Sequence, residues 1–337
     1  MSEHTVAFSR HAANVFFHIL TQCNLHCRHC YINPGQHGKG AVSLETARHW
    51  LEVLIRRSPG ANLVLLGGEP TLHPELAPII KAARSLDYAS VTIDTNGYLF
   101  HHILDRVTPA EVDFFSFSLD GATAATNDAI RGQGVFDICT EGVRQAKSRG
   151  FKTSLIYTVS NLNIGELSEM PPLLSRLGID HFFIQVIGLR GQSAADDHLS
   201  DLQLTRDQWL ERIPGVARQV AGMGIPVTYP KVFLDQKEPF SCAGRVADNY
   251  FVFPNGRVYR CPLCEDYPLH SLVFDEKDLC DTPKINESDL FDLEIPEGCV
   301  MNKLVQPRNI VYLDDGRPAY KIACCLLKEE VLPPQGD

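Results

Sequence analysis

The chain reads Asn14-Val-Phe-Phe-His-Ile-Leu20 and, shortly afterwards, Cys23-Asn-Leu-His-Cys27-Arg-His-Cys30-Tyr31. A short apolar run bounded by polar residues is typical of a buried strand, so we expect the three cysteines to lie on the loop that leaves its carboxyl end. In α/β folds, loops at the carboxyl ends of strands carry the chemistry. The sequence therefore predicts an α/β fold with a thiol-rich site at that rim.

Three thiolates at these spacings can enclose one compact inorganic centre. A cubic iron-sulfur cluster usually takes four thiolates, so a loop that offers three would leave one iron free for a non-protein ligand. The alternative is a structural zinc site with His26 or His29 as the fourth ligand. The loop alone leaves both interpretations open.

Composition restricts the class of protein. The 337 residues are 44% hydrophobic and 21% charged, which is typical of a soluble globular chain with a large core. The net charge of −10, without a block of Lys and Arg, argues against nonspecific nucleic-acid binding. No run approaches the roughly 18 apolar residues of a transmembrane helix, and we expect a cytoplasmic protein. In a reducing compartment, the eleven cysteines predict metal or redox sites rather than disulfides.

Strand-like and helix-like stretches alternate through the first two thirds of the chain. Strands are predicted at 14–20, 61–66, 90–94, 113–119, 152–159, 181–187 and 225–229. Helices are predicted between Ser43, as N-cap, and Ser58, and at 74–86, 101–107, 138–149, 165–177 and 205–223. Six strand-helix units in series imply a parallel sheet with helices on its outer face.

The pattern changes after about residue 235 to short elements rich in Pro and Cys. We therefore divide the chain into an N-terminal segment (1–13), a core barrel (14–234) and a small Cys-rich extension (235–337). The segment before Asn14 is expected to be too short for a domain of its own. Residues 188–200, rich in Gly, Ser and Asp, are expected to form a mobile loop.

Three further motifs follow predicted strands in order. They are Gly67-Gly68-Glu69-Pro70, Asp94-Thr95-Asn96-Gly97 and Ser116-Phe-Ser118-Leu-Asp120-Gly121, the last followed by Arg131. Glycines allow close backbone approach, and a Glu carboxylate can meet a cation. Each motif also has a purely structural interpretation. The Gly-Gly-Glu and Thr-Asn-Gly sequences can be strand-end turns, Ser116 and Ser118 can be small core residues with local hydrogen bonds, and Arg131 can be a solvated loop residue.

The cysteine loop and the order of these motifs resemble the radical S-adenosylmethionine (SAM) enzymes. The signature of that family is C-x3-C-x2-C followed by an aromatic residue, which Cys23, Cys27, Cys30 and Tyr31 match. The resemblance implies a partial (β/α)6 TIM-like barrel and a [4Fe-4S] cluster whose free iron chelates SAM. It further implies that Gly67, Gly68 and Glu69 bind the SAM amino group. The expected contacts to the rest of SAM come from Asn96, Ser116, Ser118, Asp120 and Gln185.

The extension holds seven of the eleven cysteines. Two strand-like runs joined at Asn255-Gly256 predict a hairpin with Cys242 and Cys261 near its ends. The interval C-x13-G-x4-C resembles the opening of SPASM and twitch extensions, which hold auxiliary [4Fe-4S] clusters. The later SPASM motif is absent, so we expect one auxiliary cluster. Its ligands would be Cys242 and Cys261 with others from Cys264, Cys280, Cys299, Cys324 and Cys325; a zinc ribbon is the alternative. Cys139 is expected to be a buried core residue.

The resemblance implies reductive cleavage of SAM to a 5′-deoxyadenosyl radical, which abstracts a substrate hydrogen. The outcome would be oxidation, cross-linking or rearrangement of a peptide or small molecule, with flavodoxin or ferredoxin as electron donor. No membrane or nucleic-acid partner is expected. The alternative from another class is a non-catalytic iron-sulfur electron carrier or zinc-binding protein. That alternative explains the cysteines but not the Gly-Gly-Glu and serine motifs.

Overall fold

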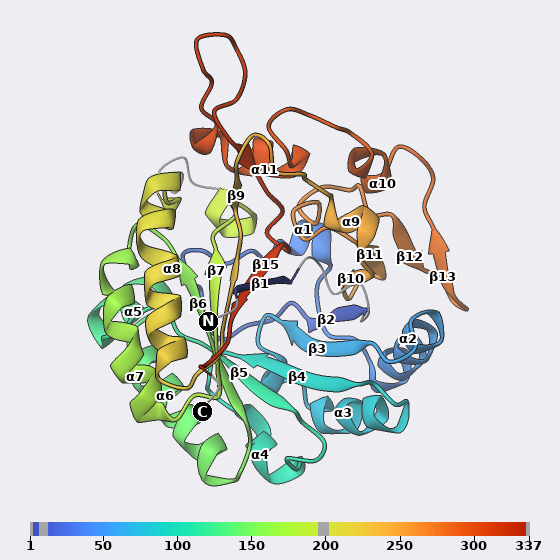
Figure 1. The fold of residues 1–337 in the computed structure, drawn as a ribbon. Coiled ribbons are helices and arrows are strands. Elements are labelled where there is room, and N and C mark those ends of the chain that lie inside the picture. The colour runs from blue at the N-terminus through green and yellow to red at the C-terminus, as the bar shows by residue number, and fades with distance from the viewer. Residues whose placement is uncertain (1–2, 7–12, 195–201, 335–337) are drawn as a thin grey trace.

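A computed structural model describes residues 3–6, 13–194 and 202–334. Seven consecutive parallel strands form the centre of the fold (Figure 1). They are β2 (Asn14–Leu20), β3 (Asn62–Gly67), β4 (Ser90–Thr95), β5 (Phe114–Ser118), β6 (Thr153–Val159), β7 (His181–Val186) and β8 (Val227–Pro230). The carboxyl ends of these strands therefore meet along one rim, as the sequence predicted.

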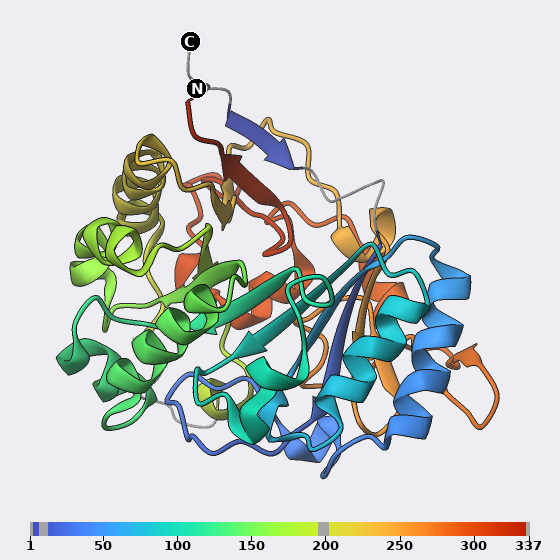
Figure 2. The same cartoon turned by 90° about the horizontal axis from the view of Figure 1, so that it is seen from below.

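Helices cover the outer face of these strands (Figure 2). They are α2 (Leu44–Arg57), α3 (Leu76–Ser85), α4 (Ile103–Arg106), α5 (Ala124–Arg131), α6 (Val135–Ser148), α7 (Met170–Leu177) and α8 (Arg206–Gly222). Ser43 caps α2 as predicted, since its side chain accepts a hydrogen bond from Thr46 N. Thr205 begins α8 with a reciprocal capping box to Gln208.

Some predicted helices differ in detail. The expected helix at 165–177 is 3-10 helix at Ile164–Glu169 and α-helix only from Met170, where Pro171 and Pro172 fall at early positions that need no N–H partner. The expected helix at 101–107 is interrupted, because His101 and His102 have positive φ. Helix α5 was not predicted. Of the predicted mobile loop, residues 191–194 form a 3-10 turn, and 195–200 lie outside the described residues.

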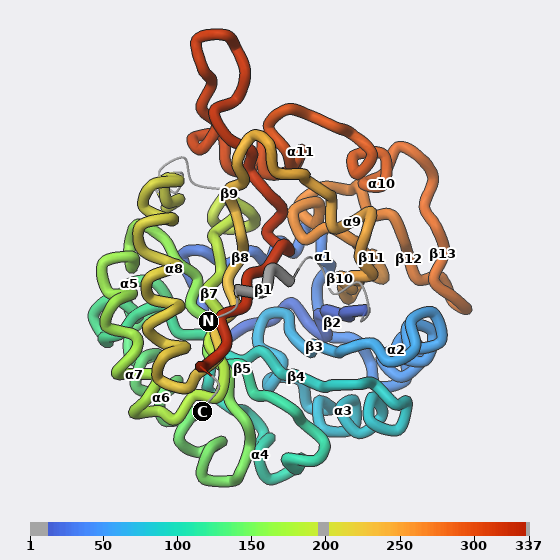
Figure 3. Tube along the Cα trace, in the orientation of Figure 1, coloured from blue at the N-terminus to red at the C-terminus, as the bar shows by residue number. Residues whose placement is uncertain are grey.

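The Cys-rich extension continues the same sheet (Figure 3). Strand β10 (Asn249–Val252) pairs in parallel with β2, and β11 (Arg257–Tyr259) completes the predicted hairpin. Beyond them follow β12 (Leu272–Phe274) and β13 (Leu279–Asp281). At the opposite edge, β15 (Lys328–Val331) runs antiparallel to β8 and to β1 (Glu3–Val6). The predicted boundary at residue 235 is thus crossed by strand pairing, and it stays a prediction.

The remaining elements are short. They are α1 (Pro34–His37), α9 (Ala243–Val246), α10 (Glu287–Phe291), α11 (Val300–Val305), the pair β9 (Phe233–Leu234) and β14 (Lys321–Ile322), and 3-10 turns at Pro70–Leu72, Phe100–His102 and Pro307–Asn309. The architecture is an open, mostly parallel α/β barrel with a Cys-rich extension, which confirms the predicted fold class.

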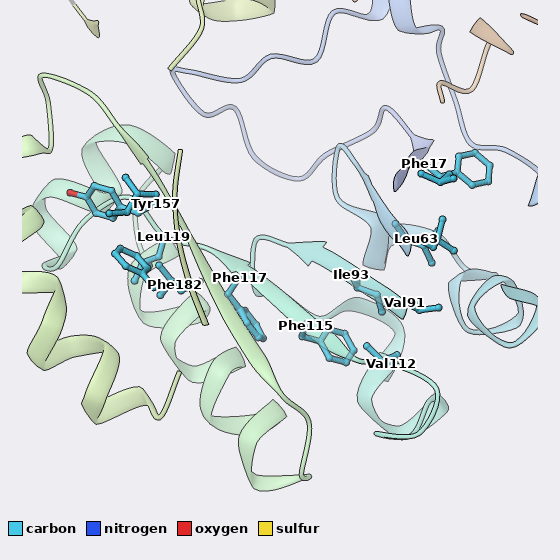
Figure 4. Packing of buried hydrophobic residues seen from close by; sticks show 14 of the residues in the cluster. Phe17, Leu63, Val91, Ile93, Val112, Phe115, Phe117, Leu119, Tyr157 and Phe182 are labelled. Carbon is cyan, nitrogen blue, oxygen red and sulfur yellow. The ribbon is translucent and has the colours of Figure 1, made fainter. Parts of the chain in front are cut away.

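The core lies between the parallel strands and their helices (Figure 4). On β4, Val91 and Ile93 are fully buried in it, whereas Thr92 and Asp94 are partly exposed on the other face. On β5, Phe115 and Phe117 belong to the same core. Because side chains alternate along a strand, Asp94 and Ser116 point to the inner face of the barrel.

Candidate functional site

The cysteine loop begins where β2 ends and carries three thiols. Cys23, Cys27 and Cys30 are partly exposed, and none forms a disulfide. Burial raises the pKa of all three thiols, that of Cys23 to about 11. The free loop therefore holds them protonated at neutral pH. Binding of a metal centre would release these protons, because metals bind the thiolate form.

Two glycines let the end of β3 lie directly against this loop. A Cβ on Gly67 would stand 2.1 Å from the Leu20 carbonyl oxygen, and one on Gly68 would stand 2.0 Å from that of Gln22. Two main-chain hydrogen bonds keep the turn against this part of the chain. Gly68 N donates to Leu20 O at 3.0 Å, and Glu69 N donates to Gln22 O at 2.9 Å. The Gly-Gly-Glu turn therefore positions the residue that precedes Cys23.

The Glu69 carboxylate is fully buried and is engaged by the protein itself. Its Oε1 accepts hydrogen bonds from Thr71 N (3.0 Å), Thr71 Oγ1 (2.6 Å) and Thr95 Oγ1 (2.8 Å). Its Oε2 accepts one from Asn96 N at 2.7 Å. Burial raises the pKa of Glu69, and these hydrogen bonds oppose the rise. The side chain joins the ends of β3 and β4, and its predicted contact with SAM stays a prediction.

Asn96 connects this turn to the cysteine loop. Its Nδ2 donates to Asn24 Oδ1 at 2.9 Å and lies 3.8 Å from Cys23 Sγ. The following Gly97 packs against α6, since a Cβ there would stand 2.6 Å from Cys139 Cα. Cys139 itself is fully buried, as predicted.

A buried charge cluster contacts the loop from the other side. Asp120 is 0% exposed; its Oδ2 lies 2.6 Å from Arg131 Nε and 3.2 Å from His29 Nε2. Its Oδ1 accepts a hydrogen bond from Thr158 N at 2.7 Å. The Arg131 main-chain oxygen lies 3.9 Å from Cys27 Sγ. Asp120, predicted as a SAM contact, thus holds Arg131 and His29 beside the thiols.

Polar groups line the inner face of the barrel near the same rim. Ser116 is buried next to Asp94, its register partner, and Ser118 is partly exposed. Burial raises the pKa of Asp94 to about 7, and a hydrogen bond with Ser116 opposes the rise. Gln185 accepts a hydrogen bond from Lys328 Nζ at 3.3 Å. Asp94 was not among the predicted site residues. The alternation of side chains along β4 would have placed it on the inner face of the barrel, since it directly precedes the Thr-Asn-Gly motif.

A polar junction joins the cysteine loop to the extension. The Arg190 guanidinium lies 5.0 Å from the centre of the Tyr31 ring and pairs with Glu265, which is 1% exposed. Gln192 N donates to Cys30 O at 2.8 Å, and Gly191 N donates to Asp266 Oδ2 at 2.7 Å. Sequence reasoning missed this junction, because its members come from three distant segments.

Four cysteines of the extension line one cavity of about 410 Å³, including its open mouth. They are Cys242, Cys261, Cys299 and Cys324. The rest of the lining is apolar, with Phe240, Phe291, Met301 and Leu326 among its residues.

The other three predicted cysteines do not line this cavity. Cys264 interacts with Cys261, and Cys325 with Cys324, but neither lines the cavity. The thiol of Cys280, on β13, donates to Asp275 Oδ2 at 3.2 Å. The structure therefore separates Cys280 from the cysteines that surround the cavity.

Two groups of thiols are candidates to hold an inorganic centre. Among the described residues, no group of three or more His, Cys, Asp or Glu side chains is arranged to hold a single metal ion. A cubane binds its thiolates at separate irons. The free thiols at the rim and the thiol-lined cavity have the chemistry that iron-sulfur clusters require.

Comparison with known proteins agrees with the fold and the loop. Residues 18–170 match the family model of the radical SAM superfamily. A pre-heme d1 synthase from Dinoroseobacter shibae is 34% identical over 181 residues, covering 53% of this chain and 44% of the relative. The mycofactocin maturase MftC of Mycobacterium tuberculosis is 29% identical over 191 residues, covering 56% and 48%.

A solved structure shares the fold across most of the chain. Streptococcus suis SuiB bound to S-adenosylmethionine superposes with a TM-score of 0.62 at 13% identity, covering 87% of this chain and 74% of SuiB.

The chain spans about half the length of the curated relatives it matches. Within the described residues, no helix has both the length and the apolar character needed to cross a bilayer.

Proposed function

We propose that this chain, whose residues 18–170 match the family model of the radical SAM superfamily, is an enzyme that reductively cleaves SAM to abstract a substrate hydrogen. The observation that carries the proposal is the contact of the Gly-Gly-Glu turn with the residues just before a loop of three free thiols, at the carboxyl ends of adjacent parallel strands. A [4Fe-4S] cluster on Cys23, Cys27 and Cys30 would supply the electron and keep one iron open for SAM.

The residues around the loop have separable roles in this proposal. Arg131 is 8% exposed, and only its Nε meets Asp120, so its terminal nitrogens are available to the SAM carboxylate. Ser116 and Ser118, on the inner face of β5, are the proposed ribose contacts. Gly68 and Glu69 keep the loop in place, and Asn96 fixes Asn24 beside Cys23.

We also propose an auxiliary [4Fe-4S] cluster in the thiol-lined cavity. Cys242, Cys261, Cys299 and Cys324 are its proposed ligands, because these four line one cavity whose other lining residues are apolar or glycine. Complete ligation by the protein favours electron transfer over direct substrate binding. Cys264 and Cys325 are proposed to support the ligands, and Cys280 is left out of the set.

The names of the relatives support only a broad substrate class for this chain. One relative is named for pre-heme d1 and the other for mycofactocin maturation. We propose a peptide or a small molecule as substrate, and oxidation, cross-linking or rearrangement as outcome. Flavodoxin or ferredoxin is the proposed electron donor, and the cytoplasm the proposed compartment. Loss of two hydrogens from a candidate peptide, measured by mass spectrometry, would identify a peptide substrate.

The test is anaerobic reconstitution followed by reduction with dithionite in the presence of SAM. Wild type should form 5′-deoxyadenosine and methionine, and a Cys23/Cys27/Cys30→Ala variant should form neither while keeping about half of the iron. Cys280→Ala is the matched control and should behave as wild type. A clustered wild type that neither binds nor cleaves SAM would instead indicate a non-catalytic iron-sulfur carrier.

A further inference from the structure

A lysine of the last strand stands at the mouth of the barrel, on the inner face of the sheet. Lys328 begins β15 and is in register with Pro230, the last residue of β8, so it lies level with the carboxyl ends of the parallel strands. Val331, three positions further on, is buried in the core, and alternation therefore turns Lys328 to the opposite face. The Lys328 ammonium donates a hydrogen bond to Gln185 Oε1 on β7 at 3.3 Å, which keeps it on that face.

The Lys328 ammonium has no carboxylate partner among the described side chains. The titratable groups that face it are the thiols of Cys325 and Cys324, and its hydrogen-bonding partner is Gln185. Burial lowers the pKa of Lys328, because packing removes water that would solvate the charge, and the two cysteines oppose this change. A thiol is a weak hydrogen-bonding group, whereas an ammonium offers three donors. Gln185 takes one of them, so two remain for a ligand.

The surroundings of Lys328 are distinct from the cysteine loop. Among the described residues, none of the titratable groups that face it belongs to that loop or to the Gly-Gly-Glu turn. The Lys328 side chain is partly exposed and can be reached from the barrel mouth. Phe183, two positions before Gln185 on the same face of β7, is also partly exposed. The inner face here thus combines one unpaired cation with an apolar ring.

We propose that Lys328 binds a carboxylate of the substrate and that Phe183 packs against the apolar group beside it. A partly buried ammonium gains most from an anion, because a charge withdrawn from water is unfavourable until it is paired. A carboxylate suits the site better than a phosphate dianion, since Arg190, the other cation that faces Cys325, is already paired with Glu265. The inference rests on the proposed function, because it names a substrate class for the same barrel.

The test measures the binding of two acids by ligand-observed NMR titration of the anaerobically reconstituted full chain, with SAM at saturation. The probes are benzoate and N-acetylglutamate α-amide, and their uncharged counterparts are benzamide and N-acetylglutamine amide. Wild type should bind at least one acid more tightly than its amide, and the acid that binds distinguishes a small aromatic acid from a peptide side chain as the source of the carboxylate.

The variants separate charge from shape. Lys328→Met, which keeps the length of the side chain without its charge, should bind that acid about 10-fold more weakly, because a charge-assisted hydrogen bond is lost. Lys328→Arg should keep most of the affinity. Lys277→Met, at an exposed turn between β12 and β13, is the matched control.

Iron content, SAM affinity and melting temperature are measured for each variant. Lys328→Met should keep all three, since an apolar side chain of similar length fills the same space; if it fails to fold, Lys328→Gln takes its place. Equal binding of acid and amide by wild type, or unchanged acid binding by the folded variant, overturns the inference and leaves the proposed function intact. Lower SAM affinity would place Lys328 at the cofactor, and lower iron content would assign its charge to the thiols, so either result also overturns the inference. Absence of SAM binding by the loaded wild type overturns the proposed function together with the inference.

Discussion

Replacement of Asp120 with Asn tests whether a buried charge cluster holds the cysteine loop in place. The Asp120 side chain is 0% exposed and that of Arg131 is 8% exposed, so both charges are removed from water. One carboxylate oxygen serves both Arg131, at 2.6 Å, and His29, at 3.2 Å. Asn can keep the hydrogen bond from Thr158 N but leaves the guanidinium without its counter-ion.

The expected cost follows from that geometry. Removing one member of a buried ion pair destabilises a protein by about 3–5 kcal/mol. The entropy of unfolding, roughly 2.1 cal/mol/K per residue, amounts to about 0.7 kcal/mol/K for a chain of this length, so the melting temperature should fall by about 4–7 °C. Since His29 lies between Cys27 and Cys30, Asp120→Asn should also lower the iron retained by the rim cluster.

Differential scanning fluorimetry and iron analysis of the reconstituted protein provide the measurement. The design is a double-mutant cycle of Asp120→Asn, Arg131→Met and the combined variant. The combined variant should lose less stability than the two single losses added together, because no buried charge is left unpaired in it. If the effects add to within about 0.5 kcal/mol, the pair is not coupled and the reasoning is refuted.

Three further predictions concern other parts of the molecule. Gly68→Ala should reduce iron loading at the rim, because its Cβ would stand 2.0 Å from Gln22 O; normal iron per chain would contradict this. Burial lowers the pKa of His18 to about 3 from an unfolded value of about 6.5, so the unfolded chain takes up the proton first and stability falls as pH drops below about 6.5. Melting temperatures of the metal-free protein should show this decline, and His18→Phe should flatten it. Cys299→Ser should lose the iron of the auxiliary site whereas Cys280→Ser keeps it, and equal losses would reject the four-cysteine set.

Most of the barrel could be predicted from local sequence patterns. Each predicted strand of the parallel sheet ends within two residues of its observed position. Apolar runs that must be buried on both faces leave little ambiguity about strand identity. Helix α5 was missed because its buried face is mostly polar, with Asn127 and Arg131 beside Ile130. It is stabilised by its Thr123 cap and by tertiary contact, including a hydrogen bond from Arg28 N to Ile130 O at 3.0 Å.

In the extension, the spacing of the cysteines does not show which of them line the cavity. The C-x2-C of Cys261 and Cys264 suggested two ligands of one centre, yet only Cys261 lines the cavity. Cys299 and Cys324 reach it from segments without a recognisable motif. The lining of the cavity depends on how distant segments of the extension fold together, and the local spacing of cysteines does not contain that information. Spacing therefore does not identify which cysteines line the cavity, and the ligand set stays a prediction.

The two acidic residues at the rim make the same point about charge. From the sequence, Glu69 was the natural partner for a cation, because it stands in a recognisable motif. The structure gives Glu69 four internal donors, two of them from residues more than 20 positions further along the chain. Among the described residues, Asp94 has a hydrogen bond with Ser116 alone, and its position is set by strand alternation and register. A motif can thus identify which loops meet, whereas the available charge depends on hydrogen bonds that form only when distant strands pair.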